Sequence, residues 1–229
     1  MHGLSELSPV DKALRSRADW FVKETDIENY LKQGGTYLDV GTGKGHITER
    51  ISEDMEKRGH KLKGYYGIEV ADKPLKKVQR RELDRQIQDG EKTNISEKNP
   101  MGFSWASADA LPFADQSMDG VSFIFSVHHM DKGQIDQAIN EAKRVLKGDG
   151  NIFIAEDLVD SDEQKLITEE IDRKLNWEGK DVEHNYKSDE EWKKYFEENE
   201  LEIIDEKFFE SQSKKGPIRH GFYALKLKK

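Results

Sequence analysis

The chain has 229 residues, of which 36% are charged and 34% apolar, and its formal net charge at pH 7 is −9. This length suits one sizeable α/β domain with a full core. The absence of cysteine excludes disulfides, a thiolate nucleophile and cysteine-ligated metals. No stretch is long and apolar enough to span a membrane, and the first residues lack the apolar run of a signal peptide, so we expect a cytoplasmic protein. The negative charge disfavours a nucleic-acid partner, because such binding neutralises phosphates.

Strand-like and helix-like segments alternate along the chain. A helical region starts at Ser8 and Pro9, which suit a cap and a first turn, and extends to about residue 32. Strands are predicted at 36–40, 63–70, 103–108, 120–125 and 151–155. Helices are predicted at 44–58, at 71–88 and around 135–146, with a loop at 89–101 and a turn at 148–150. Further helices are predicted at 161–176 and after the capping box at 188–191, followed by an antiparallel pair at 201–204 and 222–225. This alternation indicates a parallel α/β sheet with a ligand at the carboxyl ends of its strands.

The most informative motif follows the first strand. Gly41, Gly43 and Gly45 alternate between that strand and a helical pattern, and Asp39 precedes them by two residues. A P-loop would need Lys and Ser or Thr after its last glycine, whereas His46 stands there. A dinucleotide site has a different glycine spacing, and an acid at Asp39 would repel a pyrophosphate in a low-dielectric pocket. A cationic ligand with an amino group suits the acid better.

S-adenosyl-L-methionine (SAM) is such a ligand, because it carries an ammonium and a sulfonium. At this motif the chain resembles the class I SAM-dependent methyltransferases, whose first motif is an acid followed by G-x-G-x-G. The resemblance covers roughly residues 36–156 and is greatest for small-molecule methyltransferases, including those of quinone biosynthesis. It implies an α/β fold: a Rossmann-like seven-stranded, mostly parallel sheet with helices on both faces and an antiparallel C-terminal strand. Asp149 departs from the family, which usually has glycine there, at a turn remote from the predicted cofactor.

The remaining cofactor contacts are expected after the next strands. Glu69 follows the second strand and lies 24 residues beyond Gly45, where a carboxylate can accept both ribose hydroxyls. In the family that the chain resembles, the segment containing Asp109 and Ala110 meets the adenine. By the same resemblance, the backbone of Ser126 lies near the methionine end of SAM. The predicted SAM-binding residues are therefore Asp39, Gly41, Gly43, Gly45, Glu69, Asp109, Ala110 and Ser126.

The methyl acceptor is expected beyond the fourth strand. His128 and His129 are the candidate catalytic residues, since histidine can remove a proton near neutral pH; the alternative is that one packs under the sheet and the other caps a helix. Polar groups further on either converge on the acceptor or form a solvated face: Asp172, Asn176, His184 and Tyr186. No metal is expected, because the spacing of the histidines matches no recognised ligand pattern.

The predicted layout is a single methyltransferase domain. Lid helices occupy residues 1–35, the SAM-binding core 36–156, a helical substrate-side insertion 157–200, and a strand pair 201–229. The predicted function is methyl transfer from SAM to a small-molecule or lipid-like acceptor. A SAM-binding regulatory protein without turnover, and a methyltransferase acting on RNA or protein, remain alternatives, as does a nicotinamide-dependent oxidoreductase, which Asp39 and the Asp109 segment disfavour.

Overall fold

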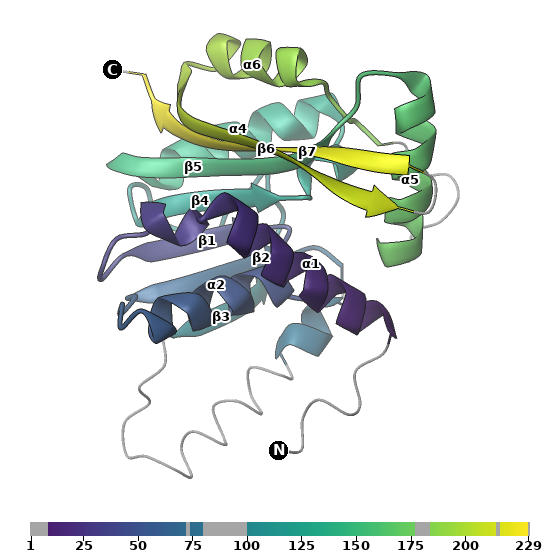
Figure 1. Cartoon of the computed structure of the whole chain (residues 1–229). Helices are drawn as coiled ribbons and strands as arrows, with labels where there is room; N and C mark the ends of the chain where they lie inside the picture. Colours follow the sequence, from purple (N-terminus) through teal and green to yellow (C-terminus); the bar gives the residue numbers. More distant parts are fainter. Residues whose placement is uncertain (1–8, 72–73, 80–99, 177–183, 214–215, 229) are drawn as a thin grey trace.

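The computed structural model describes residues 9–71, 74–79, 100–176, 184–213 and 216–228. Their strands form one seven-stranded sheet in the order β3-β2-β1-β4-β5-β7-β6, which Figure 1 shows from β3 at the bottom to β6 and β7 near the top. Five strands run parallel: β1 (Thr36–Val40), β2 (Gly64–Glu69), β3 (Met101–Trp105), β4 (Met118–Ile124) and β5 (Leu146–Leu158). β7 (Gly216–Leu227) pairs antiparallel with both β5 and β6 (Leu201–Ser213). The predicted Rossmann-like sheet is confirmed.

Helices cover both faces of this sheet. α1 (Pro9–Thr25) and α2 (His46–Lys57) contact each other on one face, the near face in Figure 1. α4 (Lys132–Val145) and α6 (Asp189–Glu198) cover the other face, and α5 (Asp162–Asn176) contacts β7. Two short 3-10 helices, η1 (Ile27–Tyr30) and η2 (Val127–His129), follow α1 and β4. None of the described helices is long and apolar enough to cross a membrane.

The alternation of side chains along each strand builds a separate core on each face. In β5, Ile152 and Ile154 pack into the core under α4 and α6, whereas Phe153 and Ala155 pack into the core under α1 and α2. β7 repeats the pattern, since Tyr223 joins the first core and Phe222 the second. Strands that are buried on both faces read as continuous apolar runs, which is typical of parallel sheets covered by helices.

Local sequence signals explain where several elements begin. The predicted capping box at α6 is present, with Glu191 N–H donating to the Ser188 hydroxyl and Ser188 N–H donating to the Glu191 carboxylate. α4 begins with an equivalent pair, Asp131 and Gln134. Such caps satisfy backbone N–H groups that the first helical turn leaves without partners.

Several boundaries differ from the sequence prediction, and β6 and β7 are both longer than the predicted strands at 201–204 and 222–225. β3 ends at Trp105 rather than at residue 108, because β2, its only partner among the described strands, ends at Glu69, which pairs with Trp105. β5 begins at Leu146 and runs through the predicted turn at 148–150, where a bulge separates the pairs Met118–Leu146 and Gly120–Asn151. Residues 74–79 are helical as predicted, but the rest of that helix, and the 89–99 part of the loop, lie outside the described residues.

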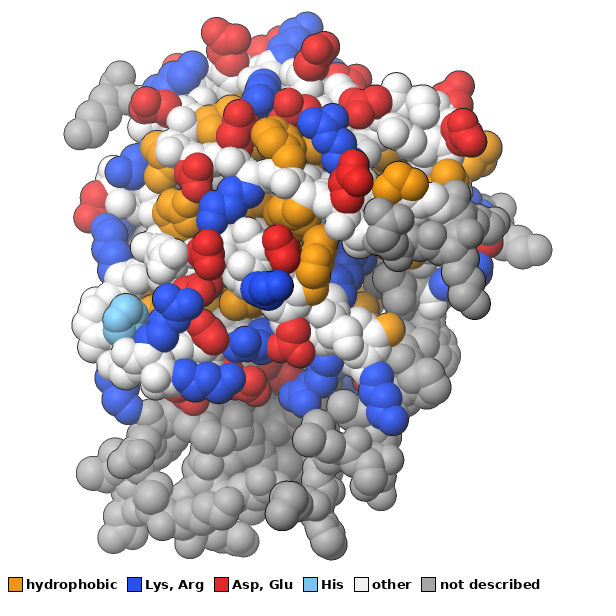
Figure 2. All heavy atoms as spheres, in the orientation of Figure 1, with side chains coloured by type: hydrophobic (Ala, Val, Ile, Leu, Met, Phe, Trp, Pro, Cys, Tyr) orange, Lys and Arg blue, Asp and Glu red, His pale blue; other side chains and the backbone are white. Residues whose placement is uncertain are grey.

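Charges of both signs are spread over the face that α1 and α2 cover. Figure 2 shows lysine and arginine side chains interspersed with acids on this face, with hydrophobic side chains visible between them. This distribution agrees with a composition that is 36% charged. The described part of this face therefore shows no basic stripe of the kind that binds nucleic acid.

Candidate functional site

The glycine loop between β1 and α2 forms a tight turn that only glycine adopts readily. Gly41, Gly43 and Gly45 have φ values of 76°, 55° and 72°. A Cβ on Gly41 would lie 2.6 Å from the Ser126 Cβ, and one on Gly45 would lie 2.3 Å from a Val78 methyl group, Cγ2. A Cβ on Gly43 would meet nothing within 4 Å. Two glycines thus let the loop pack closely on its neighbours, and the third faces open space that a ligand can enter.

Glu69 lies beside this loop at the end of β2. Its Oε2 accepts a hydrogen bond of 2.8 Å from the Gly43 N–H, and its Oε1 accepts from Val70 and Ala71 N–H groups at 2.8 and 2.9 Å. The side chain is half-buried. The structure therefore brings the predicted ribose acceptor into direct contact with the predicted glycine cradle, and Glu69 remains a predicted SAM ligand.

Asp39 lies beneath the cradle rather than on its surface. The carboxylate is 3% exposed and accepts from the Thr48 hydroxyl at 2.6 Å and from the Ser122 hydroxyl at 2.9 Å. Burial raises the pKa of Asp39, although these hydroxyl groups partly oppose the effect. Thr48 is also within 2.8 Å of the Thr42 hydroxyl in the glycine loop. A chain of hydroxyl groups therefore links the Asp39 carboxylate to the loop.

The segment after β3 is held by two side chains of α4. The Leu111 N–H donates to the Glu141 carboxylate at 2.8 Å, and Arg144 donates to the carbonyl oxygens of Leu111 and Phe113 at 3.0 and 2.9 Å. Asp109 lies in this turn and is half-buried, while the Ala110 N–H donates to the Ser107 carbonyl at 3.2 Å. The predicted adenine-binding turn is thus fixed from behind by a pair, Glu141 and Arg144, to which the sequence reasoning gave no role.

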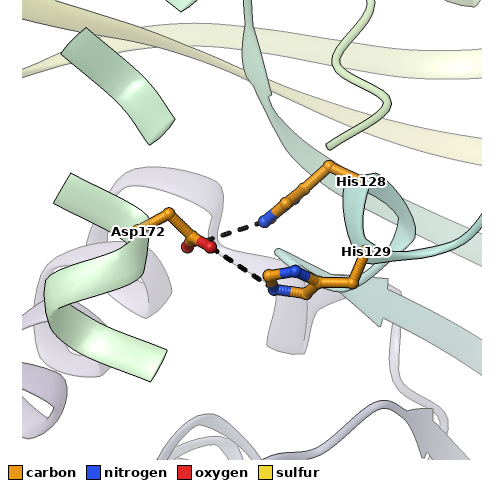
Figure 3. Close-up of side chains that lie close together, drawn as sticks. All are labelled: His128, His129 and Asp172. Carbon is orange, nitrogen blue, oxygen red and sulfur yellow. Dashed lines mark ion pairs between the residues drawn. The ribbon is translucent and has the colours of Figure 1, made fainter. Parts of the chain in front are cut away.

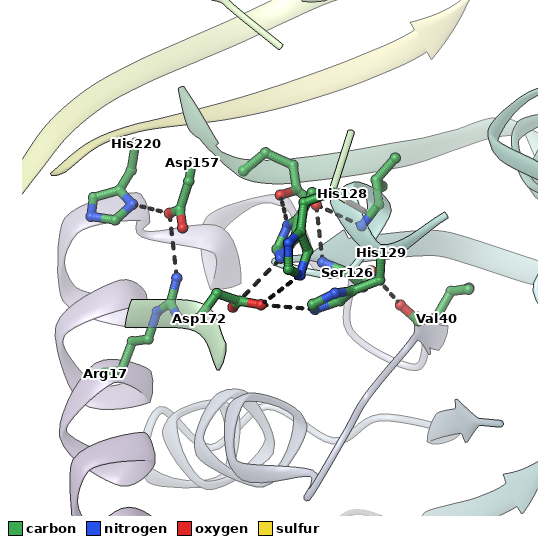
Figure 4. Close-up of polar contacts among 11 residues, drawn as sticks. Arg17, Val40, Ser126, His128, His129, Asp157, Asp172 and His220 are labelled. Carbon is green, nitrogen blue, oxygen red and sulfur yellow. Dashed lines mark hydrogen bonds and ion pairs between the residues drawn. The ribbon is translucent and has the colours of Figure 1, made fainter. Parts of the chain in front are cut away.

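A buried acid, Glu156, organises the segment after β4. Its Oε1 accepts from the backbone N–H groups of Ser126 and Val127 at 2.9 and 2.6 Å, and its Oε2 lies 2.5 Å from His128 Nδ1. The Ser126 hydroxyl donates to the Val40 carbonyl at 2.9 Å, as Figure 4 shows. Glu156 directly follows the strand predicted at 151–155 and was not among the predicted site residues. An acid directly after an apolar strand was the signal for its role.

Three histidines from distant parts of the sequence gather around Asp172 of α5. Asp172 lies 3.6 Å from His128 Nε2, 3.7 Å from His129 Nε2 and 3.3 Å from His184 Nε2, and Figure 3 shows both η2 histidines turned toward it. His128, His184 and Asp172 are buried, whereas the His129 side chain is 24% exposed. The ring of Tyr186 stacks on His128, with 4.9 Å between centroids. We call His128, His129, Asp172 and His184 the histidine cluster.

The electrostatics of His128 differ from those of an isolated histidine. Burial alone would lower its pKa, but the adjacent carboxylates of Glu156 and Asp172 outweigh burial and raise the pKa to about 10. Of the other polar groups predicted to converge on an acceptor, Asp172, His184 and Tyr186 do come together. Asn176 ends α5, and its side chain lies outside the described part of the chain.

A cavity of about 470 Å³ opens beyond the end of β5, beside the histidine cluster. Its wall combines apolar and polar side chains, among them Trp20, Ile171, Ile218, Arg17, Asp157, His220 and Asp172. Asp157 lies 3.4 Å from the Arg17 guanidinium and 2.6 Å from His220 Nδ1, an arrangement visible in Figure 4. Burial would raise the pKa of Asp157, but Arg17 and His220 together lower it.

α1 contacts both the glycine loop and the cavity. Asp11 lies 2.8 Å from the Lys44 ammonium in the loop, and Arg17 and Trp20, two turns further along, line the cavity. The Arg17 guanidinium also lies over the Phe125 ring at the end of β4. These contacts agree with a lid role for the N-terminal helices, which stays a prediction.

A family profile described as a methyltransferase domain matches residues 38–154, slightly more than half of the chain. The chain belongs to this family. It is a class I SAM-dependent methyltransferase by family, and SAM is the cofactor that this membership implies. The profile covers the glycine loop, Glu69, the Asp109 turn and the η2 histidines.

Curated relatives of this methyltransferase are proteins named for quinone biosynthesis. The chain is 31% identical over 129 residues to the ubiquinone/menaquinone biosynthesis C-methyltransferase UbiE of Hahella chejuensis. This alignment covers 55% of the chain and 44% of that protein. The chain is 27% identical over 126 residues to the demethylmenaquinone methyltransferase of Lactobacillus johnsonii, covering 55% of the chain and 45% of that protein. The alignments thus span under half of the length of these relatives.

Solved structures share the fold of this methyltransferase at low identity. A SAM-dependent methyltransferase from Methanosarcina mazei superposes with a TM-score of 0.65 at 19% identity, over 90% of the chain and 98% of that protein. The [4+2]-cyclase SpnF superposes with a TM-score of 0.66 at 16% identity, over 99% of the chain and 86% of that protein. The same architecture therefore serves proteins named for different reactions.

Proposed function

We propose that the protein transfers the methyl group of SAM to a small-molecule acceptor with an oxygen-bearing ring, of the quinol kind. The observation that carries this proposal is the cavity beyond β5, which has a volume typical of small-ligand pockets and shares Asp172 with the histidine cluster. The names of the curated relatives support the quinol class.

The walls of the cavity suit such an acceptor. Trp20, Ile171 and Ile218 offer apolar contact for a ring, while Arg17 and the Asp157–His220 pair offer charged hydrogen-bonding groups for its oxygens. The Trp20 ring is itself held edge-on against His220, with 5.0 Å between centroids. The polar groups would fix the orientation of a ring placed between these walls. The apolar side chains would exclude water from its surface.

SAM supplies an electrophilic methyl group on a positive sulfur. The chain's own residues contribute alignment and desolvation, which are the main demands of an in-line methyl transfer. In this proposal the glycine loop, Glu69 and the Asp109 turn hold the nucleoside, and the backbone of Ser126 approaches the methionine end. His128 and His129 remain the predicted catalytic residues, and both approach Asp172, which lines the cavity.

The test has two stages. Calorimetry with SAM on the full chain should show binding; a folded protein that binds no SAM would end the proposal. Incubation with labelled SAM and quinol-type acceptors, or cell extract, should then yield a labelled small molecule that mass analysis identifies.

A variant pair tests the cavity. Trp20→Leu should lower kcat/KM for the acceptor and leave the SAM Kd within about twofold, because Trp20 lines the cavity and not the cradle. Leu166→Ala is the matched control, since Leu166 is 67% exposed on α5. Equal acceptor kinetics in both variants would place the acceptor elsewhere.

A second candidate is a cofactor-binding protein that catalyses no methyl transfer. The match to the [4+2]-cyclase SpnF, at 16% identity, shows only that this fold also occurs in a protein named for another reaction, and this candidate rests on that observation. It predicts SAM binding with no label transferred to any product.

A further inference from the structure

The histidine cluster has the composition and spacing of a metal centre. We propose that His128, His129 and Asp172 bind a divalent first-row transition-metal ion, and that Glu156 and His184 orient two of these three ligands. The proposal rests on the histidine cluster alone and not on the identity of the methyl acceptor.

The separations between the ligand atoms match those around a shared ion. Two atoms bound tetrahedrally to zinc at about 2.0–2.1 Å lie roughly 3.3 Å apart. Asp172 Oδ1 and His128 Nε2 are 3.6 Å apart, and Asp172 Oδ2 and His129 Nε2 are 3.7 Å apart. One atom from each of the three residues lies within 4.8 Å of the other two. Hydrogen bonds between nitrogen and oxygen are shorter, at about 2.7–3.2 Å. Small side-chain shifts would bring all three residues onto one ion.

His128 supplies further evidence, because its buried Nε2 makes no hydrogen bond with the described residues and lies 3.6 Å from the Asp172 carboxylate. The residue is 1% exposed, and its Nε2 is the atom without a hydrogen bond. Figure 3 shows this nitrogen directed toward Asp172. Burying a polar atom without a hydrogen bond is costly, and a metal ion at this point would satisfy it.

Two neighbouring side chains, Glu156 and His184, complete the arrangement that metal ligands usually have. A ligating histidine typically donates its other ring N–H to a carboxylate, which fixes the tautomer and the ring orientation. Glu156 Oε2 lies 2.5 Å from His128 Nδ1, so it can accept a hydrogen bond from the Nδ1–H group, and Nε2 becomes the ligand atom when metal binding displaces its proton. His184 Nε2, 3.3 Å from Asp172 Oδ2, restrains the third ligand in a similar way.

The ligand set also indicates the kind of ion and its access. Imidazole and carboxylate groups suit zinc and neighbouring metals, and sites with three protein ligands keep an open coordination position. Asp172 lines the cavity beyond β5 as well as the histidine cluster. The open position would therefore be reached from the cavity, where water or an oxygen of a bound molecule can occupy it. In this proposal the two η2 histidines are ligands and not proton acceptors.

The experiment uses the full chain after treatment with a chelator and dialysis. Zinc titrated in competition with a chromophoric chelator should bind with a stoichiometry of one, and cobalt should give the visible spectrum of a nitrogen- and oxygen-ligated ion. Asp172→Asn and His129→Gln should each weaken zinc binding by more than about a hundredfold, and Glu156→Gln by about 10- to 100-fold.

His220→Gln is the matched control. His220 is equally buried, but both of its ring nitrogens are already paired, with Asp157 and with Ser211. This variant should keep the wild-type zinc affinity. Circular dichroism checks that each variant is folded. If Asp172→Asn misfolds, the zinc affinity of His129→Gln is the test, because His129 is partly exposed. The proposal is overturned if the wild type binds no zinc, or if it binds zinc no more tightly than His129→Gln. SAM calorimetry is a separate measurement, so failure of one proposal leaves the other standing.

Discussion

Replacing Glu69 by alanine should weaken SAM binding by about 10- to 150-fold. A hydrogen bond to a charged acceptor contributes about 1.5–3 kcal/mol, and that range converts to this change in Kd. The two Glu69 oxygens accept from three backbone N–H groups, including that of Gly43 in the cradle. A ribose with two vicinal hydroxyls would bind at the same carboxylate. Glu69 therefore carries two contributions, one to the shape of the loop and one to the ligand.

A second variant separates these contributions. Glu69→Gln keeps one acceptor oxygen and a similar volume, so it should weaken binding less than Glu69→Ala. The assay is isothermal titration calorimetry with SAM, beside denaturant unfolding to report the loss of loop contacts. Glu53→Ala is the control, because Glu53 is an exposed acid on α2. If folded Glu69→Ala binds SAM within about twofold of the wild type, the ribose contact lies elsewhere.

Three further predictions concern Asp39, the glycine loop and the turn that Arg144 holds. Because burial raises the folded-state pKa of Asp39, wild type should gain stability relative to Asp39→Asn as the pH falls through that raised pKa. Denaturant unfolding at several pH values checks this, and a difference independent of pH contradicts it. Gly59→Ala should lower the free energy of unfolding by roughly 1 kcal/mol, because the only strain it introduces comes from the φ of 73°. Gly41→Ala should lower the free energy of unfolding by about 1–3 kcal/mol more than Gly59→Ala, because the new Cβ also overlaps Ser126. Equal unfolding free energies for the two variants would contradict this overlap. Arg144→Lys should weaken SAM binding about fivefold by releasing the Leu111 turn, whereas Arg58→Lys should not, as calorimetry can show.

Much of the fold was predictable because its signals are local. The apolar runs of β1 and β4, the glycines after β1 and the capping box at Ser188 each specify their element within a few residues. β3 and β5 were misjudged at their ends because strand length depends on the partner. The sequence near residue 148 contains turn residues, yet the chain bulges there and continues as β5, since β4 offers a ladder on both sides of the bulge.

The part of the candidate site that lies on one sequence motif was predictable. The part formed by residues from several separate elements was not. Gly43 and Glu69 fell on consecutive strand ends, so their contact follows from parallel pairing. The histidine cluster draws on η2, α5 and the segment before α6, and no spacing rule connects such distant positions. The expectation of no metal was based on spacing alone, and the geometry around Asp172 is the reason for proposing one.

The position of β7 has a consequence for how the protein is made. Its residues follow those of every other described strand, yet β7 lies inside the sheet between β5 and β6 and carries His220 to the cavity wall. During synthesis the cradle strands β1 to β4 can pair long before residue 216 leaves the ribosome, whereas the wall of the cavity cannot. If the two proposed sites hold SAM and the acceptor, a nascent chain would form the first of them well before the second.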